Sequence, residues 1–168
     1  MSTSTTHTVV DSPLGGLTAT AEGGALTGLY FPRHRGMPSV ESLGTRTDEG
    51  FEEVRRQLAE YFAGRRTRFE LPLAPRGEEF QQRVWRLLRE IPYGRTRSYG
   101  ELAQELGDPS LARAVGAANG RNPLSVIVPC HRVVGADGRL TGYAGGLGRK
   151  RFLLELEAPV PAAAGRLF

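Results

Sequence analysis

The chain has 168 residues and a single cysteine, Cys130. One cysteine cannot form an intramolecular disulfide, and a free thiol is typical of proteins in the reducing cytosol. Histidines are also few, and His7, His34 and His131 have no spacing that resembles a zinc or haem site. We therefore expect a cytoplasmic protein with no metal and no cofactor.

The sequence also lacks a long hydrophobic run. No apolar stretch approaches the roughly 18 residues that a membrane-spanning helix needs. Residues 1–7 are polar and do not have the basic and then apolar pattern of an export signal. These absences predict a protein that is neither exported nor bound to a membrane.

Lysine is nearly absent, because 21 of the 22 basic residues are arginine. The net charge is +4, and the excess lies in the second half: residues 76–157 hold 13 basic and 9 acidic residues, whereas residues 1–75 hold 8 and 9. A guanidinium group can bind a phosphate through two hydrogen bonds and can stack on bases. The second half therefore has the charge that a nucleic-acid partner requires, although this charge is weak evidence by itself.

The first half contains three short β-prone stretches, at 8–10, 17–21 and 25–31. The glycine pair at 23–24 is a good two-residue hairpin turn, and the three stretches predict an antiparallel meander. Residues 32–50 are rich in proline, glycine, serine and charge, and we interpret them as a surface loop or a mobile connection.

Apolar residues at helical spacing predict a helix over 51–62, which Gly64 ends. Residues 69–75 are expected to form one more strand followed by a linker. We place a domain boundary after them. It divides the chain into a variable α/β domain at 1–76 and a second domain at 77–168.

The second domain begins with helical patterns. The apolar positions of 78–91 form one stripe, in which we expect Trp85 to belong to the core. Ser98 and Glu101 form a capping box at the start of the next helix, which runs to about Leu106.

Gly107 ends that helix, and Asp108 with Pro109 predicts the start of another, which runs to about Asn119. Two short helices joined by a turn that contains glycine, within a basic segment, suggest a helix-turn-helix. Arg113 would project from its second helix. An ordinary pair of antiparallel helices with a solvated arginine explains the same pattern, and the local sequence leaves both open.

Cys130 follows a short apolar run, 126–128, which we predict to be a strand ended by Pro129. A free cysteine is usually an inert, buried side chain. Here His131 follows it, and an imidazole that accepts the thiol proton, directly or through a water, converts the thiol into a nucleophile.

Such a nucleophile also needs a group that orients the imidazole. We predict a helix over 149–157, which offers the carboxylates of Glu155 and Glu157, and the residues alone do not choose between them. Before this helix, a glycine-rich stretch at 134–147 contains Tyr143. This stretch either lets the backbone approach a flat substrate or is a flexible loop.

Together these motifs resemble one family. The segment Ile127-Val-Pro-Cys-His-Arg-Val-Val134, with Asn122-Pro123 before it and Tyr143-Ala-Gly-Gly-Leu147 after it, is similar to the active-site region of the O6-alkylguanine-DNA alkyltransferases, also called methylated-DNA–protein-cysteine methyltransferases. The resemblance covers residues 77–157, about half the chain. Its further motifs are Phe80-Gln-Gln-Arg-Val-Trp85, Ile91-Pro-Tyr-Gly94, Ser98-Tyr-Gly-Glu-Leu-Ala103 and Ala112-Arg-Ala-Val-Gly116.

The resemblance implies a role for each matching residue. Cys130 is expected to accept the alkyl group, His131 to act as a base through a water, and Glu157 to complete the relay. Asn122 resembles the hinge asparagine between the recognition helix and the active-site strand. Tyr99 resembles the tyrosine that rotates a phosphate and contacts the extruded base, and Arg113 resembles the arginine that replaces the flipped nucleotide in the duplex. Ala112 and Gly116 match positions on the DNA-binding helix. The residues that match the lining of the alkylguanine pocket are Val133, Tyr143 and Ala144.

The implied function is direct reversal of DNA damage. An alkyl group, such as methyl, passes from O6 of a flipped guanine, and also from O4 of thymine, to the cysteine, and each molecule acts once. The implied partner is double-stranded DNA that contains O6-alkylguanine, bound by a monomer, with cooperative binding along DNA left open.

The implied fold is a ribonuclease-H-like α/β domain, with antiparallel hairpins and a helix, followed by a mostly α winged-helix-like domain whose helix-turn-helix enters the minor groove. The stretch Gly77-Glu78-Glu79-Phe80 departs from the more common Gly-Thr-x-Phe of the family. We expect this difference to affect the start of the helix and not the chemistry. The single cysteine also excludes the zinc-bearing module that is fused to some bacterial relatives.

Two other interpretations use the same residues. A Cys-His-Glu hydrolase would form a labile thioester and turn over, but neither a helix-turn-helix nor Arg113 is expected in it. A non-catalytic protein that binds alkylated DNA would resemble the family with its cysteine replaced, whereas Cys130 is present.

Overall fold

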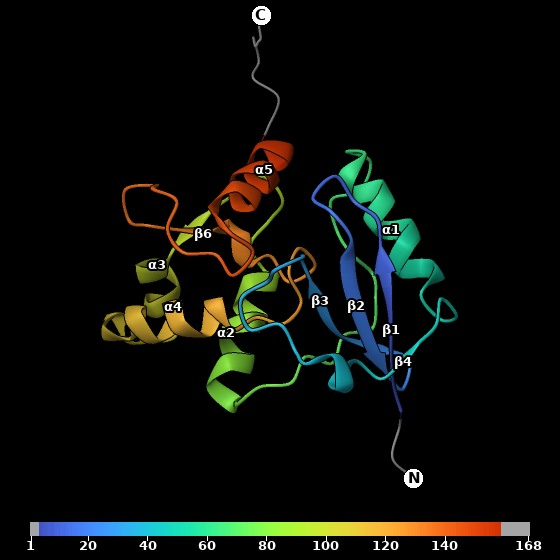
Figure 1. The fold of residues 1–168 in the computed structure, drawn as a ribbon. Coiled ribbons are helices and arrows are strands. Elements are labelled where there is room, and N and C mark those ends of the chain that lie inside the picture. The colour runs from blue at the N-terminus through green and yellow to red at the C-terminus, as the bar shows by residue number, and fades with distance from the viewer. Residues whose placement is uncertain (1–3, 159–168) are drawn as a thin grey trace, which may run out of the picture.

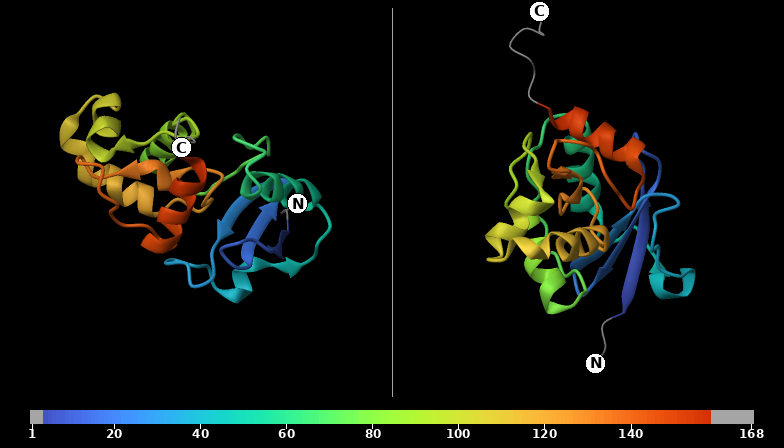
Figure 2. Two further views of the ribbon diagram at one scale, coloured as in Figure 1. Left: turned by 90° about the horizontal axis from the view of Figure 1, so that it is seen from above. Right: turned by 90° about the vertical axis from the view of Figure 1, so that its left-hand side faces the viewer.

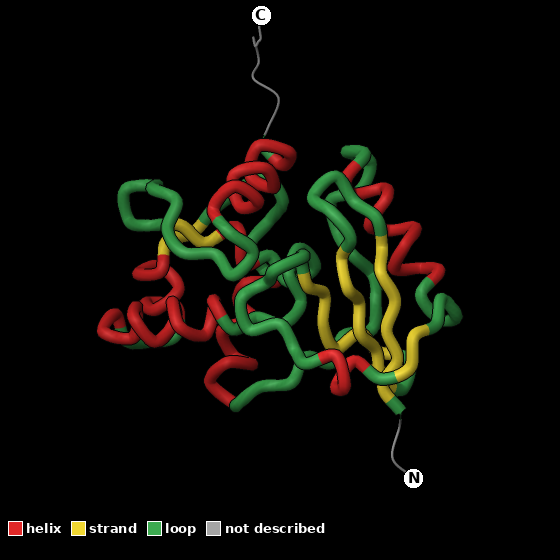
Figure 3. The backbone as a smooth tube through the Cα atoms, in the orientation of Figure 1, coloured by secondary structure: helices red, strands yellow, loops and turns green. Residues whose placement is uncertain are grey.

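The computed structural model describes residues 4–158. The polar start of the chain at 1–3 and the end of the predicted second domain at 159–168 lie outside the described residues. The strands of the larger sheet gather in one half of the molecule and most of the helices in the other (Figures 1 and 3). The chain therefore consists of an N-terminal mixed-sheet domain and a C-terminal helical domain.

The predicted meander is confirmed. Strands β1 (Thr5–Val10), β2 (Leu17–Glu22) and β3 (Ala25–Tyr30) pair antiparallel, and the glycine pair at 23–24 makes the turn between the last two. Both glycines have positive φ, 61° and 84°, as this type of hairpin turn requires.

The segment 32–50, which we predicted as a loop, also contains regular structure. A 3₁₀ turn, η1 (Val40–Leu43), leads into the short strand β4 (Thr45–Arg46), which pairs parallel with β1 and gives the order β3-β2-β1-β4. A two-residue strand is too short for an apolar alternation to reveal it. Gly44, at φ 75°, brings the chain so close to the Thr5 carbonyl that a side chain at this position would collide with it.

Helix α1 (Glu52–Phe62) packs on one face of this sheet (Figure 2). It was predicted within a residue of its bounds, and Gly64 follows it at φ 78°. The strand predicted within 69–75 is wrong: only Leu73 forms an isolated bridge, beside Leu26 on the edge of β3. Pro72 and Pro75, on either side of Leu73 and Ala74, lack backbone donors, so a longer ladder cannot form.

The C-terminal domain consists mainly of helices α2 (Glu79–Arg89), α3 (Tyr99–Glu105), α4 (Ala112–Gly120) and α5 (Leu147–Glu157). Trp85 is 2 % exposed, and its indole N–H donates to the Ala118 carbonyl at 2.8 Å, so it ties α2 to α4 within the core as expected. A two-stranded parallel sheet of β5 (Arg97–Ser98) and β6 (Val133–Val134), which was not predicted, links the start of α3 to the chain after Cys130.

The predicted helix pair is also confirmed. The Ser98 hydroxyl accepts from the Glu101 amide at 3.1 Å, and the Glu101 carboxylate accepts from the Ser98 amide at 2.8 Å. After Gly107, however, the second helix does not begin directly at Pro109. Its first turn is the 3₁₀ segment η2 (Pro109–Leu111), which Asp108 caps, and α4 follows.

The strand predicted at 126–128 is wrong. These apolar residues are buried, as the pattern indicated, but they form an irregular turn in which Val126 has a φ of 73°. The Asn122 side chain forms hydrogen bonds with this segment that a neighbouring strand would otherwise form. Its amide donates to the Val128 carbonyl at 2.9 Å, and its oxygen accepts from the Leu124 amide at 3.0 Å. Burial alone does not distinguish such a turn from a strand.

This turn also joins the two domains. The Leu29 amide of β3 donates to the Pro123 carbonyl at 2.8 Å, and the Ser125 amide donates to the Leu29 carbonyl at 3.2 Å. One continuous core contains residues of both domains. Across the described part of the chain, no helix has the length and apolar character needed to cross a membrane.

Two glycines with similar φ angles, Gly24 and Gly44, allow the close approach of β4 to β1 to be tested. Gly24→Ala places a side chain at φ 84° in open space, which should cost roughly 1–2 kcal/mol of stability. Gly44→Ala adds a collision with Thr5 to the strain of a backbone conformation, φ 75° and ψ −157°, that essentially only glycine adopts. We expect the Gly44 variant to lose clearly more free energy of unfolding in urea titrations, and equal losses would contradict the close approach of β4 to β1.

Candidate active site

Cys130 opens a 3₁₀ turn, η3 (Cys130–Arg132), that follows Pro129. Its side chain does not emerge from the end of a strand, as was predicted, but lies inside the molecule with 4 % of the residue exposed. The Cys130 amide donates to the Val128 carbonyl at 2.7 Å, and the Asn119 side-chain amide lies 3.4 Å from the Cys130 carbonyl oxygen. The position of the thiol is therefore determined by the hydrogen-bonded turn that Asn122 organises.

The structure brings His131 together with Glu157 and not with Glu155. Glu157 is the last residue of α5, 2 % exposed, and its Oε2 lies 2.7 Å from His131 Nε2. Glu155 is exposed. Of the two carboxylates that the sequence left open, only Glu157 faces the imidazole.

Two further residues that were not predicted hold the same carboxylate. Arg132 donates from Nε to Glu157 Oε1 at 2.7 Å and from Nη2 to Oε2 at 3.1 Å, and its Nη1 donates to the Ile91 carbonyl at 2.6 Å. From α1 of the other domain, the Tyr61 hydroxyl donates to Glu157 Oε2. Arg132 is adjacent to His131 in sequence, but nothing local marks Tyr61, which lies 96 residues before its partner.

The charges of this buried network determine which nitrogen of His131 carries the proton. Burial alone would raise the pKa of Glu157, but the hydrogen bonds from His131 and Arg132 outweigh it and lower the pKa to about 2. Burial lowers the pKa of His131 below its usual 6.5, although Glu157 opposes the shift. A neutral imidazole that faces an anion through Nε2 carries its proton there, so Nδ1 is left as a hydrogen-bond acceptor.

Three buried side-chain atoms within residues 4–158 have no hydrogen-bond partner, and all three belong to residues around Cys130. Buried polar atoms are paired in the great majority of cases, so each unpaired one calls for an explanation such as a catalytic role or a bound water. One of them is the acceptor Nδ1 of His131. The other two are the Asn119 side-chain oxygen and the Tyr143 hydroxyl.

Cys130 is a neutral thiol in this environment. Burial raises the pKa of the thiol above its usual 9.0, while a hydrogen bond from Asn122 and the positive charge of Lys150 oppose the shift. A thiolate is the reactive nucleophile. The site therefore keeps the thiol protonated at rest and has an acceptor, His131 Nδ1, available nearby.

Lys150 is a functional candidate that the sequence analysis missed. It is fully buried, its ammonium group donates to the Thr141 carbonyl at 2.7 Å, and burial lowers its pKa to about 8 although Cys130 acts in the opposite direction. The sequence feature that could have identified Lys150 is its rarity, because it is the only lysine of the chain. A lone lysine among 21 arginines suggests a place where a compact charge is needed.

Of the expected pocket residues, Val133 belongs to β6, which follows the Cys130 turn, whereas Tyr143 and Ala144 lie on the loop before α5. Val133 and Tyr143 are buried, and Ala144 is half-buried with its carbonyl accepting from the Arg35 amide at 3.0 Å. The Tyr99 hydroxyl accepts from Thr141 Oγ1 at 3.1 Å, so Tyr99 contacts the same loop from α3. The structure therefore places these residues around one site.

The expected DNA-binding residues lie on α4, apart from Tyr99, which begins α3. Arg113 is exposed, and no ion pair to it is found among residues 4–158. Ala112 is half-buried beside it, and Gly116 faces Tyr99, because a Cβ at Gly116 would lie 3.7 Å from the tyrosine ring. Arg113 and Tyr99 are thus presented by the two helices of the helix pair.

The chain matches two family descriptions that together cover most of it. Residues 5–75 match the ribonuclease-like domain of 6-O-methylguanine DNA methyltransferase, and residues 79–159 match the DNA-binding domain of the same family.

Similar proteins are found in bacteria and archaea. The chain is 52 % identical, over 90 % of its length and 91 % of the relative, to a methylated-DNA–protein-cysteine methyltransferase of Mycobacterium tuberculosis, and 48 % identical to one of Methanosarcina acetivorans over 90 % and 97 %. Its fold is similar to the crystal structure of M. tuberculosis OGT in complex with DNA, with a TM-score of 0.87 and 52 % identity over 92 % of this chain and 95 % of that one.

The buried Glu157 predicts a specific loss of stability in acid. Its pKa is about 2 in the folded protein against an ordinary 4.5, so the unfolded state binds more protons between these values and the stability that Glu157 contributes is lost as pH falls from about 4.5 towards 2. Glu157→Gln should lower stability near pH 7 by about 3–5 kcal/mol, because it leaves Arg132 buried without its partner. In urea titrations across pH, the difference between wild type and variant should shrink over this acid range, and a constant difference would refute the low pKa.

Proposed function

Because this chain belongs to the 6-O-methylguanine DNA methyltransferase family, we propose that it repairs alkylated DNA by moving the alkyl group from O6 of guanine to the sulfur of Cys130. One observation supports the assignment of this chemistry to particular residues. His131, the residue after the only cysteine of the chain, forms a buried pair with Glu157, in which Nε2 lies 2.7 Å from Oε2. The same chemistry extends to O4 of thymine.

The first step is removal of the thiol proton. His131 accepts it at Nδ1, directly or through one water, and becomes an imidazolium whose Nε2–H already donates to Glu157. Because Glu157 is an anion, it stabilises the positive charge that forms on the ring. Lys150 stabilises the thiolate in the same way, since its positive charge favours the ionised form of Cys130.

The second step is displacement at a saturated carbon. A sulfur electron pair forms the new S–C bond while the bond from the alkyl carbon to O6 breaks, and the electron pair of that bond passes to the guanine. The guanine leaves easily only if a proton or hydrogen bond neutralises this developing charge, and the Tyr99 hydroxyl is our candidate donor. The thioether that forms on Cys130 is not readily cleaved to regenerate the thiol, so each protein molecule acts once.

The lesion must leave the base stack to reach the buried thiol. Unstacking costs a few kcal/mol, which Arg113 would offset by filling the vacated space in the duplex. Helix α4 then lies in the minor groove, with Ala112 and Gly116 towards the DNA. Since Cys130 is only 4 % exposed and Tyr99 contacts Thr141, we propose that the loop between β6 and α5 moves when the base enters.

Asn122, Val133, Tyr143 and Ala144 complete the proposed site. Asn122 holds the turn before Cys130 in place, as a hinge between α4 and the active-site segment. The other three would line the alkylguanine pocket, in which the unpaired hydroxyl of Tyr143 is available to a ligand.

Finer features of the assignment are proposals as well. We propose domain bounds of 1–76 and 77–168, a ribonuclease-H-like first domain and a winged-helix-like second domain. We also propose a monomer that needs neither metal nor cofactor, because a thiolate, a base and hydrogen-bond donors suffice for the displacement. A free thiol supports a cytoplasmic location.

The two alternative interpretations are not supported. A Cys-His-Glu hydrolase does not agree with relatives that are about half identical over nine-tenths of the chain and are named methyltransferases. A purely lesion-binding protein needs no nucleophile, whereas Cys130 lies in a site with an available proton acceptor.

Single-turnover transfer can be tested by intact-protein mass spectrometry. After mixing with an excess of duplex DNA that contains O6-methylguanine, the protein should gain the mass of one CH₂ group, located on Cys130, and then stop. Cys130→Ser should still bind the duplex but gain no mass. A wild-type protein that binds the duplex unmodified would favour the lesion-binding interpretation.

The role of Arg113 can be separated from the chemistry by comparing two substrates. Arg113→Ala should slow transfer from duplex DNA by roughly tenfold or more, because support for the flipped state is lost. Transfer from free O6-benzylguanine, which needs no flipping, should change little. Arg83→Ala removes an exposed arginine from α2 and serves as the control. Equal losses of both reactions in Arg113→Ala would contradict a flipping role.

A further inference from the structure

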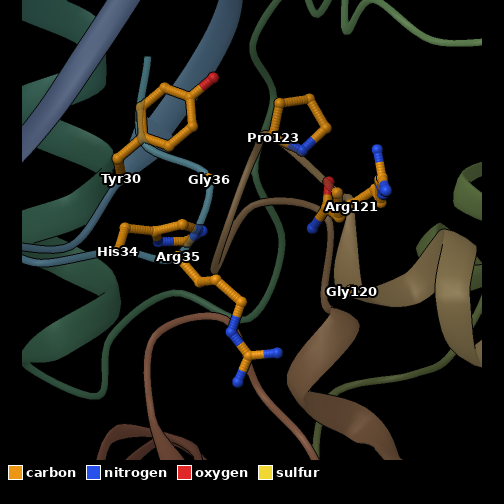
Figure 4. Close-up of a pocket in the computed structure, with 8 residues that line it drawn as sticks. Tyr30, His34, Arg35, Gly36, Gly120, Arg121 and Pro123 are labelled. Carbon is orange, nitrogen blue, oxygen red and sulfur yellow. The ribbon is translucent and has the colours of Figure 1, made fainter. Parts of the chain in front are cut away.

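A cavity of about 400 Å³ lies between the two domains, and Cys130 does not belong to its lining. Figure 4 shows that one wall comes from the end of β3 and the segment after it, with Tyr30, His34 and Arg35, and the other from the end of α4 and the residues that follow it. The complete lining is Tyr30, His34, Arg35, Gly36, Gly120, Arg121, Asn122 and Pro123. Neither domain forms this cavity by itself.

The cavity is lined by positive charge without any negative charge. Arg35 belongs to one wall and Arg121 to the opposite wall, and no aspartate or glutamate belongs to its lining. Neither arginine forms an ion pair within the described part of the chain. Two unpaired guanidinium groups around one cavity favour an anion, and they suit a phosphate because each can donate two parallel hydrogen bonds.

His34 supports the same ligand independently. The residue is 6 % exposed, and its Nδ1 accepts from the Phe31 amide at 3.3 Å, so the proton of the ring is on Nε2. Burial and the charge of Arg149 lower the pKa of His34 to about 4, so the ring stays neutral. Among residues 4–158, Nε2 has no hydrogen-bond partner. His34 is thus a nearly buried donor on the wall of the cavity, with no acceptor of its own.

The location of the cavity indicates where the phosphate comes from. Arg121 directly follows α4, whereas Arg113 lies near the start of this helix. The nine residues of α4 span about 13 Å, and each strand of DNA carries a phosphate about every 3.4 Å along the axis. A duplex bound along α4 can therefore reach both ends of the helix with neighbouring parts of its backbone.

From these observations we infer that the cavity between Arg35 and Arg121 is a second DNA contact, which holds a backbone phosphate and brings the N-terminal domain into DNA binding. The inference rests on the proposed function, since it assigns a further surface to the same DNA. It also connects this contact to the active site: the main-chain amide of Arg35 donates to the carbonyl of Ala144 at 3.0 Å, on the loop beside Cys130.

Salt-dependent binding tests this site. The affinity of the full chain for an undamaged duplex is measured by fluorescence anisotropy over a range of salt, for wild type, Arg35→Ala, Arg121→Ala and the double variant. Each single variant should bind several-fold more weakly, and the slope of log affinity against log salt should decrease by about 0.9, the value for one lost phosphate contact. Because both arginines hold the same phosphate, the double variant should lose about one contact and not two.

Arg33→Ala is the matched control. It removes the same charge from the same exposed segment, but Arg33 does not line the cavity. This control should bind like wild type, and thermal melting should confirm that every variant is folded. An equal loss in Arg33→Ala would show that only the overall charge matters and would overturn the site, as would unchanged binding by Arg35→Ala and Arg121→Ala.

The outcome is distinguishable from failure of the proposed function. Wild-type transfer from free O6-benzylguanine to Cys130 needs no DNA contact and tests the chemistry alone. If that reaction proceeds while the Arg35 and Arg121 variants bind DNA normally, only the phosphate site is refuted. If wild type neither reacts nor binds DNA, the proposed function itself fails.

Discussion

The structure depends on one buried carboxylate. Glu157 accepts hydrogen bonds from His131, from two nitrogens of Arg132 and from Tyr61, and so joins α5, the turn that carries Cys130, and α1 of the other domain. An uncompensated charge in this place would be strongly destabilising, so the carboxylate is retained only while all its donors are in position. Its burial therefore requires the two domains to stay together.

The same interaction prepares His131 for the role that we propose. The anion keeps the proton of His131 on Nε2, and this leaves Nδ1 as an acceptor for the thiol proton. Meanwhile burial raises the pKa of Cys130, so the thiol is protonated and weakly reactive until a substrate changes its surroundings. A protein that is consumed by one reaction benefits from a nucleophile that is not exposed to every electrophile in solution.

The N-terminal domain takes part in the site. Tyr61 supports Glu157, the Arg35 amide holds the loop of Ala144, and the Arg149 guanidinium of α5 donates to the Pro32 carbonyl at 2.9 Å while lying over the ring of Phe31. These contacts connect the segment after β3 to the active-site loop from two sides. The domain therefore contributes to the position of the pocket walls, and through Arg35 to the cavity that we assign to a phosphate.

The sequence by itself determined the local elements and the nature of the chemistry. The hairpin glycines, the capping box of Ser98 and the adjacency of Cys130 and His131 act over a few residues, so their patterns are visible in the chain. The residues alone left Glu155 and Glu157 open, and the family resemblance implied Glu157. Only the tertiary structure showed that Glu157 faces His131, brought Tyr61 across 96 residues to this carboxylate, and turned the apolar run at 126–128 into a bend held by Asn122. The physical reason is that a buried charge and an irregular turn are stabilised by partners distant in sequence, which leave no local periodicity.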